Sequence, residues 1–384
     1  MVETVTIGTA ARGRHAEHEA FRGGVRKAEL PGGEQAWVIA GYDDVARLLG
    51  DPRLSVDKKH SGGGYSGFTL PPALDRNLMN MDGDTHGRVR KLAAPAFSRK
   101  SAEILRASVD RVAADVFTAL SEKDGDTVDL MTELCMPVSA LVIAEQLGVP
   151  SDLYAGMREA ATAMMTFDAR SKASGQRLMA AIGWYTTTIA ELIAAKRSTP
   201  GEDLLSSWIK ARDDEDRLSE DELVSLAFLL MLAGLENAAL LPGAMIAALL
   251  DTEDRRTIIA DWPNHRAGLI ERHNPLPFAI RRFAVTDLTF GDQTIPKGDT
   301  VLLSLFGADS DPARNGRPSL MFGRGPHYCL GAQVTDLIVD AVVPAFCTRY
   351  PDARLAIPAA NLVYRESWRS HGLAELPVRL STQP

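Results

Sequence analysis

The spacing of apolar residues divides the chain into a long helical middle and shorter strand-like parts. From residue 86 to residue 250, apolar positions recur at helical spacing between polar caps and breaks. The further elements we expect are a strand at 37–40, a helix at 42–49, strands at 278–284 and 300–305, and a helix at 331–346. The pattern predicts a mainly α protein with small β-sheets.

One expected helix is apolar on nearly every side. It begins at Ser219-Glu220-Asp221-Glu222, which has the form of a capping box, and runs to about Leu250. At 1.5 Å per residue it would be roughly 45 Å long. Glu236 is the only charged side chain between Val224 and Leu250. Because a carboxylate in the middle of a membrane span is costly, we expect a buried helix and no membrane span. Pro242 should kink it one turn beyond Glu236.

A long irregular segment precedes the helical region. Residues 60–77 hold three consecutive glycines, Gly62 to Gly64, and two prolines, Pro71 and Pro72. Loops of this length inside a compact domain often line binding sites. We therefore expect this segment to lie beside a ligand.

Composition narrows the class of protein. The chain has 384 residues and a formal net charge of −8, with no composition break, so we expect one domain, 1–384, and no nucleic-acid partner. Its three cysteines are Cys135, Cys329 and Cys347. An odd, sparse set fits a reducing compartment, and residues 1–5 lack the basic and apolar regions of a signal peptide. We expect a cytoplasmic protein.

The strongest chemical signal is the run 322–331, FGRGPHYCLG, which sets Cys329 on a glycine-rich loop before a helix. Glycines let the backbone turn tightly and approach a flat cofactor. Amides at the start of the helix stabilise negative charge on sulfur. The arrangement suits a thiolate bound to iron. The structural alternative is a buried free cysteine in a glycine-rich turn.

This run resembles the heme-binding loop of the cytochrome P450 family, F-G-x-G-x-H-x-C-x-G, and all six fixed positions match. The resemblance implies an α-rich single-domain fold and a bound heme b (iron protoporphyrin IX). It makes Cys329 the axial iron ligand. Phe322, Gly323, His327 and Gly331 would complete the cofactor-binding loop.

The buried helix carries a second family element. Ala233-Gly234-Leu235-Glu236-Asn237 is similar to the oxygen-activating motif A-G-x-[D/E]-T, with Asn237 in place of the threonine. The resemblance gives Glu236 and Asn237 catalytic roles in handling protons and water. Asparagine can hold a water molecule but is a poor proton donor. The alternative is that Glu236 pairs with a distant arginine for structure alone.

The heme propionates need cationic or hydrogen-bonding partners. His86 and Arg90 lie four residues apart, on one face of a helix, and look like the family's H-x-x-x-R element. Arg282 and His327 are the other two candidates that the resemblance indicates. Each residue alone could equally be a basic side chain on a solvated face.

Three features depart from the family pattern. Arg272 matches the arginine of E-x-x-R, but Leu269 stands where the glutamate belongs. Only residues 313–321 separate Asp311-Pro312 from the cysteine loop, so much of the usual meander, and most of its ion cluster, is missing. We expect Arg272 to be partly exposed or to have another partner. Asp336 replaces an arginine near the redox-partner surface, which weakens the case for a standard ferredoxin.

The substrate should lie above the heme, against segments 62–78, 161–167, 232–237 and 276–280 and the turn 370–372. Methionines on a helix face are more often core residues, so these side chains are candidates only. The candidate substrate residues are Met164, Met165, Phe167, Leu232, Ala233, Phe278, Ile280 and His371.

The resemblance implies an oxidoreductase that tailors a specialised metabolite, a small molecule or a peptide. The reaction would be hydroxylation, epoxidation or aromatic C–C, C–O or C–N coupling, with electrons from a ferredoxin and its reductase. An alternative of another class is a helper protein with reduced catalysis that stabilises a partner enzyme. A third possibility is peroxide-driven or substrate-assisted activation, in which the substrate supplies the hydroxyl that Asn237 lacks.

Overall fold

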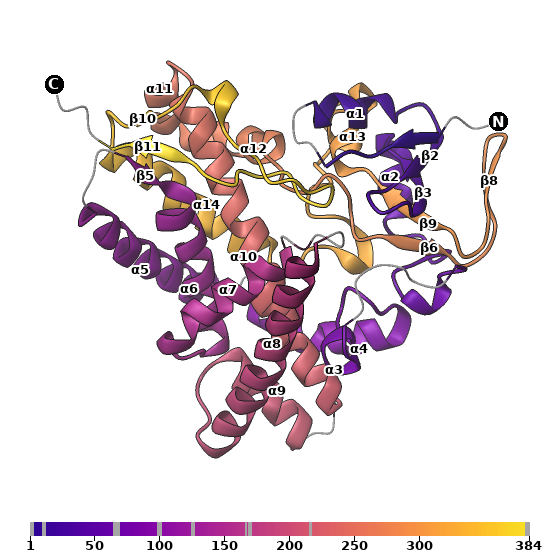
Figure 1. Cartoon of the computed structure of the whole chain (residues 1–384), viewed down its shortest axis with the longest axis horizontal. Coiled ribbons are helices and arrows are strands. Elements are labelled where there is room, and N and C mark those ends of the chain that lie inside the picture. Colours follow the sequence, from indigo (N-terminus) through magenta and orange to yellow (C-terminus); the bar gives the residue numbers. More distant parts are fainter. Residues whose placement is uncertain are drawn as a thin grey trace.

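The computed structural model describes residues 4–9, 13–63, 70–97, 102–123, 127–165, 167, 171–214 and 217–380. A large helical part lies on one side, and a smaller part built on a six-stranded sheet lies on the other (Figure 1). Each part has its own buried apolar clusters. The mainly α fold with small sheets is confirmed.

The helical part is built around one long central helix, α10, which packs against α6, α3 and α14. The expected helices at 42–49 and 331–346 are present as α2 and α14. The helices are α1 (Arg14–Ala20), α2 (Tyr42–Leu48), α3 (Pro72–Asp75), α4 (Gly83–Ala93), α5 (Ala102–Ser121), α6 (Met136–Leu147), α7 (Tyr154–Met165), α8 (Lys172–Ser198), α9 (Leu204–Asp213), α10 (Glu220–Leu250), α11 (Arg255–Ala260), α12 (Trp262–Arg272), α13 (Leu305–Asp309) and α14 (Ala332–Arg349).

The six-stranded sheet has the order β1-β2-β3-β9-β6-β4, and β9 runs parallel to β3 with Leu303 opposite Ile39. Two smaller sheets have the orders β10-β11-β5 and β7-β8. The strands are β1 (Thr4–Thr6), β2 (Val25–Glu29), β3 (Gln35–Ile39), β4 (Leu54–Ser55), β5 (Val128–Asp129), β6 (Arg282–Ala284), β7 (Leu288–Phe290), β8 (Gln293–Ile295), β9 (Thr300–Leu303), β10 (Arg354–Leu355) and β11 (Pro377–Arg379).

The strand expected at 278–284 is shorter than predicted, because β6 begins only at Arg282. Before it, Phe278 forms a single isolated bridge with Ser304. Pro275 and Pro277 lack the amide hydrogens that a sheet ladder needs, so regular pairing starts after them.

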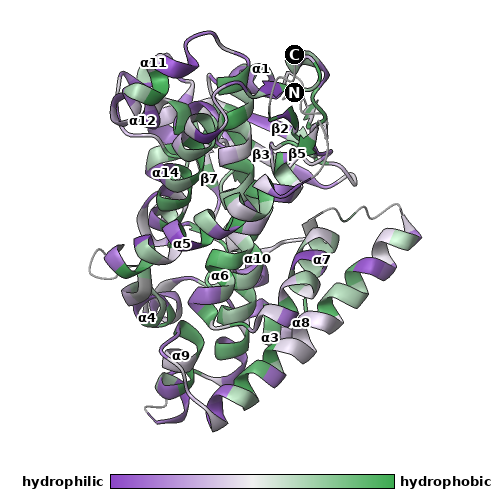
Figure 2. Cartoon of the chain, turned by 90° about the vertical axis from the view of Figure 1, so that its left-hand side faces the viewer, coloured by the Kyte–Doolittle hydropathy of each residue, from purple (hydrophilic) through white to green (hydrophobic). Residues whose placement is uncertain are grey.

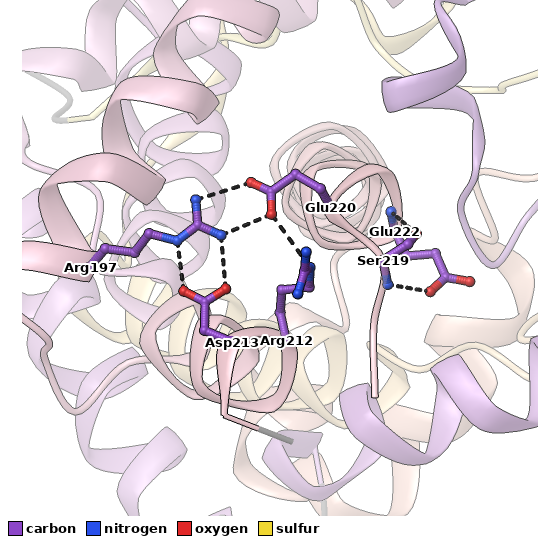
Figure 3. Close-up of polar contacts among 6 residues, drawn as sticks. All are labelled: Arg197, Arg212, Asp213, Ser219, Glu220 and Glu222. Atoms are coloured by element: carbon purple, nitrogen blue, oxygen red, sulfur yellow. Dashed lines mark hydrogen bonds and ion pairs between the residues drawn. The ribbon is translucent and has the colours of Figure 1, made fainter. Parts of the chain in front are cut away.

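The start of α10 is held in place from two sides. Ser219 and Glu222 form the predicted capping box, with the Ser219 amide donating to Glu222 at 2.8 Å and the Glu222 amide donating to Ser219 Oγ at 3.2 Å. Arg197 of α8 also bridges Asp213 at the end of α9 and Glu220 at the start of α10 (Figure 3). Three helices are thereby joined at one corner.

Of the two long apolar helices, α10 lies inside the protein. Both α8 and α10 are long and apolar enough to cross a membrane by length and composition. Most α10 residues are nevertheless buried against other elements of the chain, as expected for a core helix, and hydrophobic colour follows α10 and α6 through the middle of the helical part (Figure 2). The helix continues through Pro242 to Leu250.

The irregular segment at 60–77 is described only in part, because residues 64–69 lie outside the described residues. Its first half is pinned to the sheet, since the Gly62 amide donates to the Gly298 carbonyl at 2.9 Å. A single helical turn, α3, forms at Pro72–Asp75 and packs against α10.

Candidate active site

The cysteine loop folds largely through its own backbone. Gly323 and Gly325 both adopt φ of 73°, in the left-handed region that glycine tolerates best. The Cys329 amide donates to the Phe322 carbonyl at 2.8 Å and closes the loop. The next residues begin α14, where the amides of Gly331 and Ala332 donate to the Cys329 sulfur. The sulfur therefore lies at the positive end of a helix.

Cys329 differs from the other two cysteines in its surroundings. Cys135 and Cys347 are buried, whereas Cys329 is exposed. The protein around Cys329 still raises the pKa of its thiol through desolvation, while the amides of Gly331 and Ala332 and the charge of Arg90 oppose this rise. A metal ion deprotonates a coordinating thiol outright. An exposed cysteine whose sulfur accepts two helix amides fits an iron ligand better than it fits a buried free cysteine.

Two buried basic side chains near this loop lack partners for one nitrogen each. His86 of α4 is 3% exposed, and among the described residues its Nε2 has no partner. Burial, with His327 and Arg90 nearby, lowers the pKa of His86 to about 4. Arg282 of β6 is also 3% exposed and donates through Nη2 to the Leu49 carbonyl at 3.2 Å, but its Nε is unpartnered in the described chain. Burial lowers the pKa of Arg282 to about 10.

The remaining two propionate candidates have protein partners. Arg90 Nη2 donates to the Tyr328 carbonyl at 2.6 Å, which ties α4 to the cysteine loop. His327 Nε2 lies 2.9 Å from Asp82 Oδ1, and its ring centroid is 4.3 Å from that of His86. The four predicted residues therefore come from three separate segments, and His86 and Arg90 on α4 each lie against the cysteine loop.

Asp82 organises this side of the site. Its second carboxylate oxygen accepts hydrogen bonds from Ser55 Oγ at 2.6 Å and from the Val56 amide at 2.8 Å. Desolvation raises the pKa of Asp82, but the hydrogen bonds from His327, Ser55 and Val56 outweigh it and hold the pKa well below its usual range. Asp82 stays ionised and fixes the orientation of His327.

The middle of α10 presents the second half of the site. Ala233 is exposed and most of its neighbours at 229–237 are half-buried, whereas most residues of α10 as a whole are buried. Asn237 is one turn further along the same face. Asn237 Oδ1 is buried without a partner among the described residues. An exposed alanine and an unsatisfied amide oxygen at the centre of a core helix indicate a space that a ligand and water would fill.

Glu236 has partners far away in the sequence. Arg365 Nη1 lies 3.2 Å and Ser370 Oγ 3.3 Å from Glu236 Oε1. Burial raises the pKa of Glu236, while Arg365 and Ser370 lower it and only partly offset the burial. The carboxyl is thus a buried acid whose protonation can change. Glu236 therefore does pair with a distant arginine, Arg365. This pair is compatible both with a catalytic role of Glu236 and with a purely structural one.

The residues present fit a heme. An accessible cysteine sulfur, two buried basic groups with unused nitrogens, and an open face on α10 are each unfavourable or unexplained without a ligand. A cofactor with an iron centre and two carboxylates would satisfy the sulfur and the basic groups together.

The departures from the family pattern have structural consequences. Arg272 is exposed, as predicted, and no described residue forms an ion pair or hydrogen bond with its side chain. One expectation needs correction, because the ion cluster has not simply been removed. Glu271, adjacent to Arg272, pairs with Arg314 at 2.8 Å. Asp336, in the place of the usual arginine, pairs with Arg266 at 2.9 Å.

The candidate substrate residues differ in their surroundings. Ala233 is exposed at the open face of α10. Phe278 is buried in the sheet core, with its ring 4.6 Å from that of His18, which favours a packing role. His371 packs on Tyr364 and lines a cavity elsewhere. Met164, Phe167, Leu232 and Ile280 are partly buried, and the side chain of Met165 lies outside the described part.

Sequence reasoning missed Asp82 and Arg365, and it placed Ser370 in a turn beside the substrate without predicting its contact with Glu236. Asp82 directly precedes α4, a position that usually serves as a helix cap, so its pairing with His327 had no local signal. Arg365 and Ser370 are 129 and 134 residues from Glu236. Only the tertiary fold brings them together.

Known proteins resemble this chain in fold and in sequence over almost its whole length. Cytochrome P450 107B1 of Saccharopolyspora erythraea is 31% identical, with 96% of this chain and 95% of that protein covered. The 6-deoxyerythronolide B hydroxylase of the same organism is 31% identical, with 91% of each covered. The solved structure of the tirandamycin C-bound P450 monooxygenase TamI has a TM-score of 0.88 at 30% identity and covers 98% of this chain and 100% of that chain. No protein-family model matches the sequence.

The cysteine loop and the buried basic groups define a heme-thiolate enzyme. With the likeness over nearly its full length, the chain belongs to the cytochrome P450 family and is an oxidoreductase of the monooxygenase type.

Proposed function

We propose that this chain is a single-domain heme b enzyme that oxidises a specialised metabolite. The observation that carries the proposal is the accessible Cys329 sulfur, held by the Gly331 and Ala332 amides at the start of α14. Heme with a thiolate ligand supplies oxidising chemistry with dioxygen when it is bound. The chain's own residues hold the cofactor, position the substrate and control proton entry.

On the cofactor side, Arg282 and His86 would bind the propionates through the nitrogens that lack protein partners. Arg90 would hold the cysteine loop against α4 through the Tyr328 carbonyl. His327 would be kept in place by Asp82. The pairing of His327 with Asp82 makes it a weaker propionate ligand than Arg282, because the Asp82 charge opposes a second anion.

On the distal side, Glu236 would deliver protons and Asn237 would hold water. Burial favours the protonated form of Glu236, while Arg365 and Ser370 favour the ionised form. A carboxyl with opposing influences of this kind can both take up and release a proton. Asn237 Oδ1, unsatisfied within the described protein, can accept a hydrogen bond from a water molecule.

The relatives support a natural-product substrate. One is named for hydroxylating 6-deoxyerythronolide B, and one solved structure holds tirandamycin C. We therefore propose hydroxylation or epoxidation of a small metabolite, with Ala233, Leu232, Ile280, Met164 and Phe167 as candidate wall residues. Aromatic coupling, including coupling within a peptide, is a second candidate, because it needs no oxygen insertion and is less dependent on the threonine that Asn237 replaces.

We further propose cytoplasmic action with electrons from a ferredoxin and its reductase. Asp336, paired with Arg266, stands where the family commonly has an arginine. We therefore expect activity to differ between ferredoxins.

The competing proposal is a helper protein with reduced catalysis. It is favoured by two replacements in family motifs, Leu269 for the glutamate of E-x-x-R and Asn237 for the threonine of the oxygen-activating motif. The test is a screen of candidate metabolites with the heme-loaded protein. A type I spectral shift followed by product formation with ferredoxin, reductase and NADPH supports the enzyme. Heme binding without turnover of any shifting ligand, together with stimulation of a partner enzyme, supports the helper.

Substrate-assisted activation has its own test. In Asn237→Thr a hydroxyl becomes available to the proton relay. If the substrate already supplies that hydroxyl, product formed per NADPH should change little. A large gain in coupling would argue against substrate assistance, and peroxide-supported turnover without a reductase would argue for the peroxide route.

A further inference from the structure

A second cavity, of about 740 Å³, lies beyond the heme-binding side of α10. It is bounded by the C-terminal half of α10, the end of α12, α1, α13 and the C-terminal segment. The α10 residues in its wall include the small side chains of Ala244, Ala247 and Ala248. Ala244 follows Asn237 by seven residues on the same helix face, roughly 10 Å along the axis.

The C-terminal turn separates this cavity from the heme-binding side. Leu240 lies between Asn237 and Ala244 on α10 and is 1% exposed. Gly372 packs so closely on it that a Cβ at position 372 would come within 2.5 Å of the Leu240 side chain. The neighbouring residue, His371, lines the second cavity. The two spaces therefore lie on opposite sides of one tight contact.

Flat rings form one wall of the cavity. His15 stacks on Phe306 with centroids 4.2 Å apart and planes 5° from parallel. His371 stacks on Tyr364 with centroids 5.0 Å apart. Burial, with His15, Arg14 and His273 nearby, lowers the pKa of His371 to about 4, so its ring is neutral at pH 7. Uncharged planar surfaces of this kind favour the flat face of an organic ligand.

Two hydrogen-bond donors in the lining have no acceptor. In the family pattern a glutamate three residues earlier would accompany Arg272, but this chain has Leu269 there. No described residue pairs with the Arg272 guanidinium. Asn274 is 3% exposed. Its Oδ1 accepts from the Leu276 amide at 2.9 Å, but its Nδ2 is buried without a partner in the described structure. A buried, unsatisfied amide nitrogen requires an acceptor from a ligand or water.

The carboxylates of the lining are largely engaged already, apart from Asp251, which is exposed at the rim. Their partners are Arg314 for Glu271 at 2.8 Å, Arg22 for Glu19 at 3.5 Å, and Ser319 Oγ with the Leu320 amide for Asp309. The lining therefore offers two hydrogen-bond donors without acceptors, Arg272 and Asn274. An anionic ligand that accepts hydrogen bonds fits these donors better than a cation would.

We propose that this cavity is a binding site for an aromatic carboxylate, with the carboxylate on Arg272 and Asn274 and the ring against the wall of His15, Phe306, Tyr364 and His371. The site is separate from the heme and goes beyond the proposed oxidation. An arginine freed by the loss of its glutamate would serve a new ligand.

The test uses benzoate as the probe and benzamide as its uncharged control, titrated into the ferric heme-loaded protein by calorimetry with the Soret band recorded in parallel. We expect benzoate to bind with a dissociation constant on the order of 1 mM, as suits so small a ligand, and to leave the Soret band unmoved. Arg272→Gln should weaken binding at least tenfold, Arg272→Lys should retain part of it, and benzamide should bind at least tenfold more weakly than benzoate.

The control variant is Arg256→Gln, since Arg256 is an exposed arginine on α11 outside the cavity. It should bind benzoate like the parent. Equal melting temperatures and equal carbon monoxide spectra establish that Arg272→Gln is folded. The proposal is overturned if benzoate does not bind, if benzamide binds equally well, or if binding shifts the Soret band and survives Arg272→Gln, which would place benzoate beside the heme. None of these outcomes bears on whether the enzyme oxidises a metabolite.

Discussion

The cysteine loop and the centre of α10 form the two halves of one site, but they are held by contacts of different range. The loop is closed by the Cys329 amide on Phe322 and by the amides that follow the cysteine, all within ten residues. Glu236 instead depends on Arg365 and Ser370, more than a hundred residues away. The proposed iron ligation therefore depends on local sequence, while the proposed proton handling depends on the docking of the C-terminal segment.

The largest effect should come from the distal acid. Glu236→Gln keeps the size of the side chain but removes the ionisable group. We expect coupled product formation to fall about 100-fold, a typical contribution of general acid–base catalysis, while reduced oxygen is diverted to peroxide. Product and peroxide per NADPH measure the change. An unaltered heme spectrum is the control, and full coupling in this variant would show that Glu236 is only structural.

Arg282→Ala tests the cofactor side. Loss of a charge-assisted hydrogen bond to a propionate should weaken heme retention by roughly tenfold to a hundredfold. The same change removes a buried cation with an unsatisfied nitrogen, so the heme-free protein should melt at the same or a higher temperature. Heme transfer to apomyoglobin and melting with and without heme measure both effects.

The control for this experiment is Arg53→Ala, which removes an arginine that is 53% exposed and paired with Asp51. It should retain heme like the parent. Equal heme loss in the two variants would show that Arg282 does not bind the heme.

A smaller effect is expected from Arg365→Gln. Arg365 lowers the pKa of Glu236, so without it burial raises that pKa further. Because Glu236 is proposed to deliver protons from its protonated form, the alkaline limb of the pH–rate profile should move to higher pH, with activity rising along that limb. Arg369→Gln, which alters an exposed arginine of the same segment, should leave the profile in place. An unshifted profile in Arg365→Gln would break the proposed dependence on the C-terminal segment.

The smallest effect concerns the support of His327. The pKa of Asp82 is lower in the folded protein than in the unfolded chain, so its stabilisation is complete above about pH 4 and is lost as the pH falls through the folded value. Asp82→Asn should cost about 1–2 kcal/mol at pH 7, since a third of the side chain is exposed.

Urea unfolding at pH 7 and pH 3 measures this difference, which should shrink at the lower pH. Asp84→Asn, in the first turn of α4 just after Asp82, should show little change at either pH. A constant difference for Asp82→Asn would mean that the hydrogen bonds, and not the charge, carry the stabilisation.

Local sequence signals predicted the elements that depend on near neighbours. The capping box of Ser219 and Glu222, the glycine turns before Cys329 and the placement of His86 and Arg90 on one helix all rest on short spacings. The strand predicted to start at residue 278 was too long, because Pro275 and Pro277 lack the amide hydrogens that sheet pairing needs, and β6 begins only at Arg282.

The partners of Glu236 and His327 could not be predicted in the same way. A buried carboxyl shows that a partner must exist but does not say which of many arginines it is. The pairing of Glu271 with Arg314 shows the same limit, since a shift of one position along α12 selects a different partner from the one that the family pattern indicates.

The most direct measurement is the carbon monoxide spectrum of the dithionite-reduced, hemin-supplemented protein, compared with Cys329→Ser and with Cys347→Ala as the control. The account predicts the red-shifted Soret band of a thiolate adduct in the parent and in Cys347→Ala, and its loss in Cys329→Ser. A parent protein that stays colourless, or that binds carbon monoxide without this band, would contradict it.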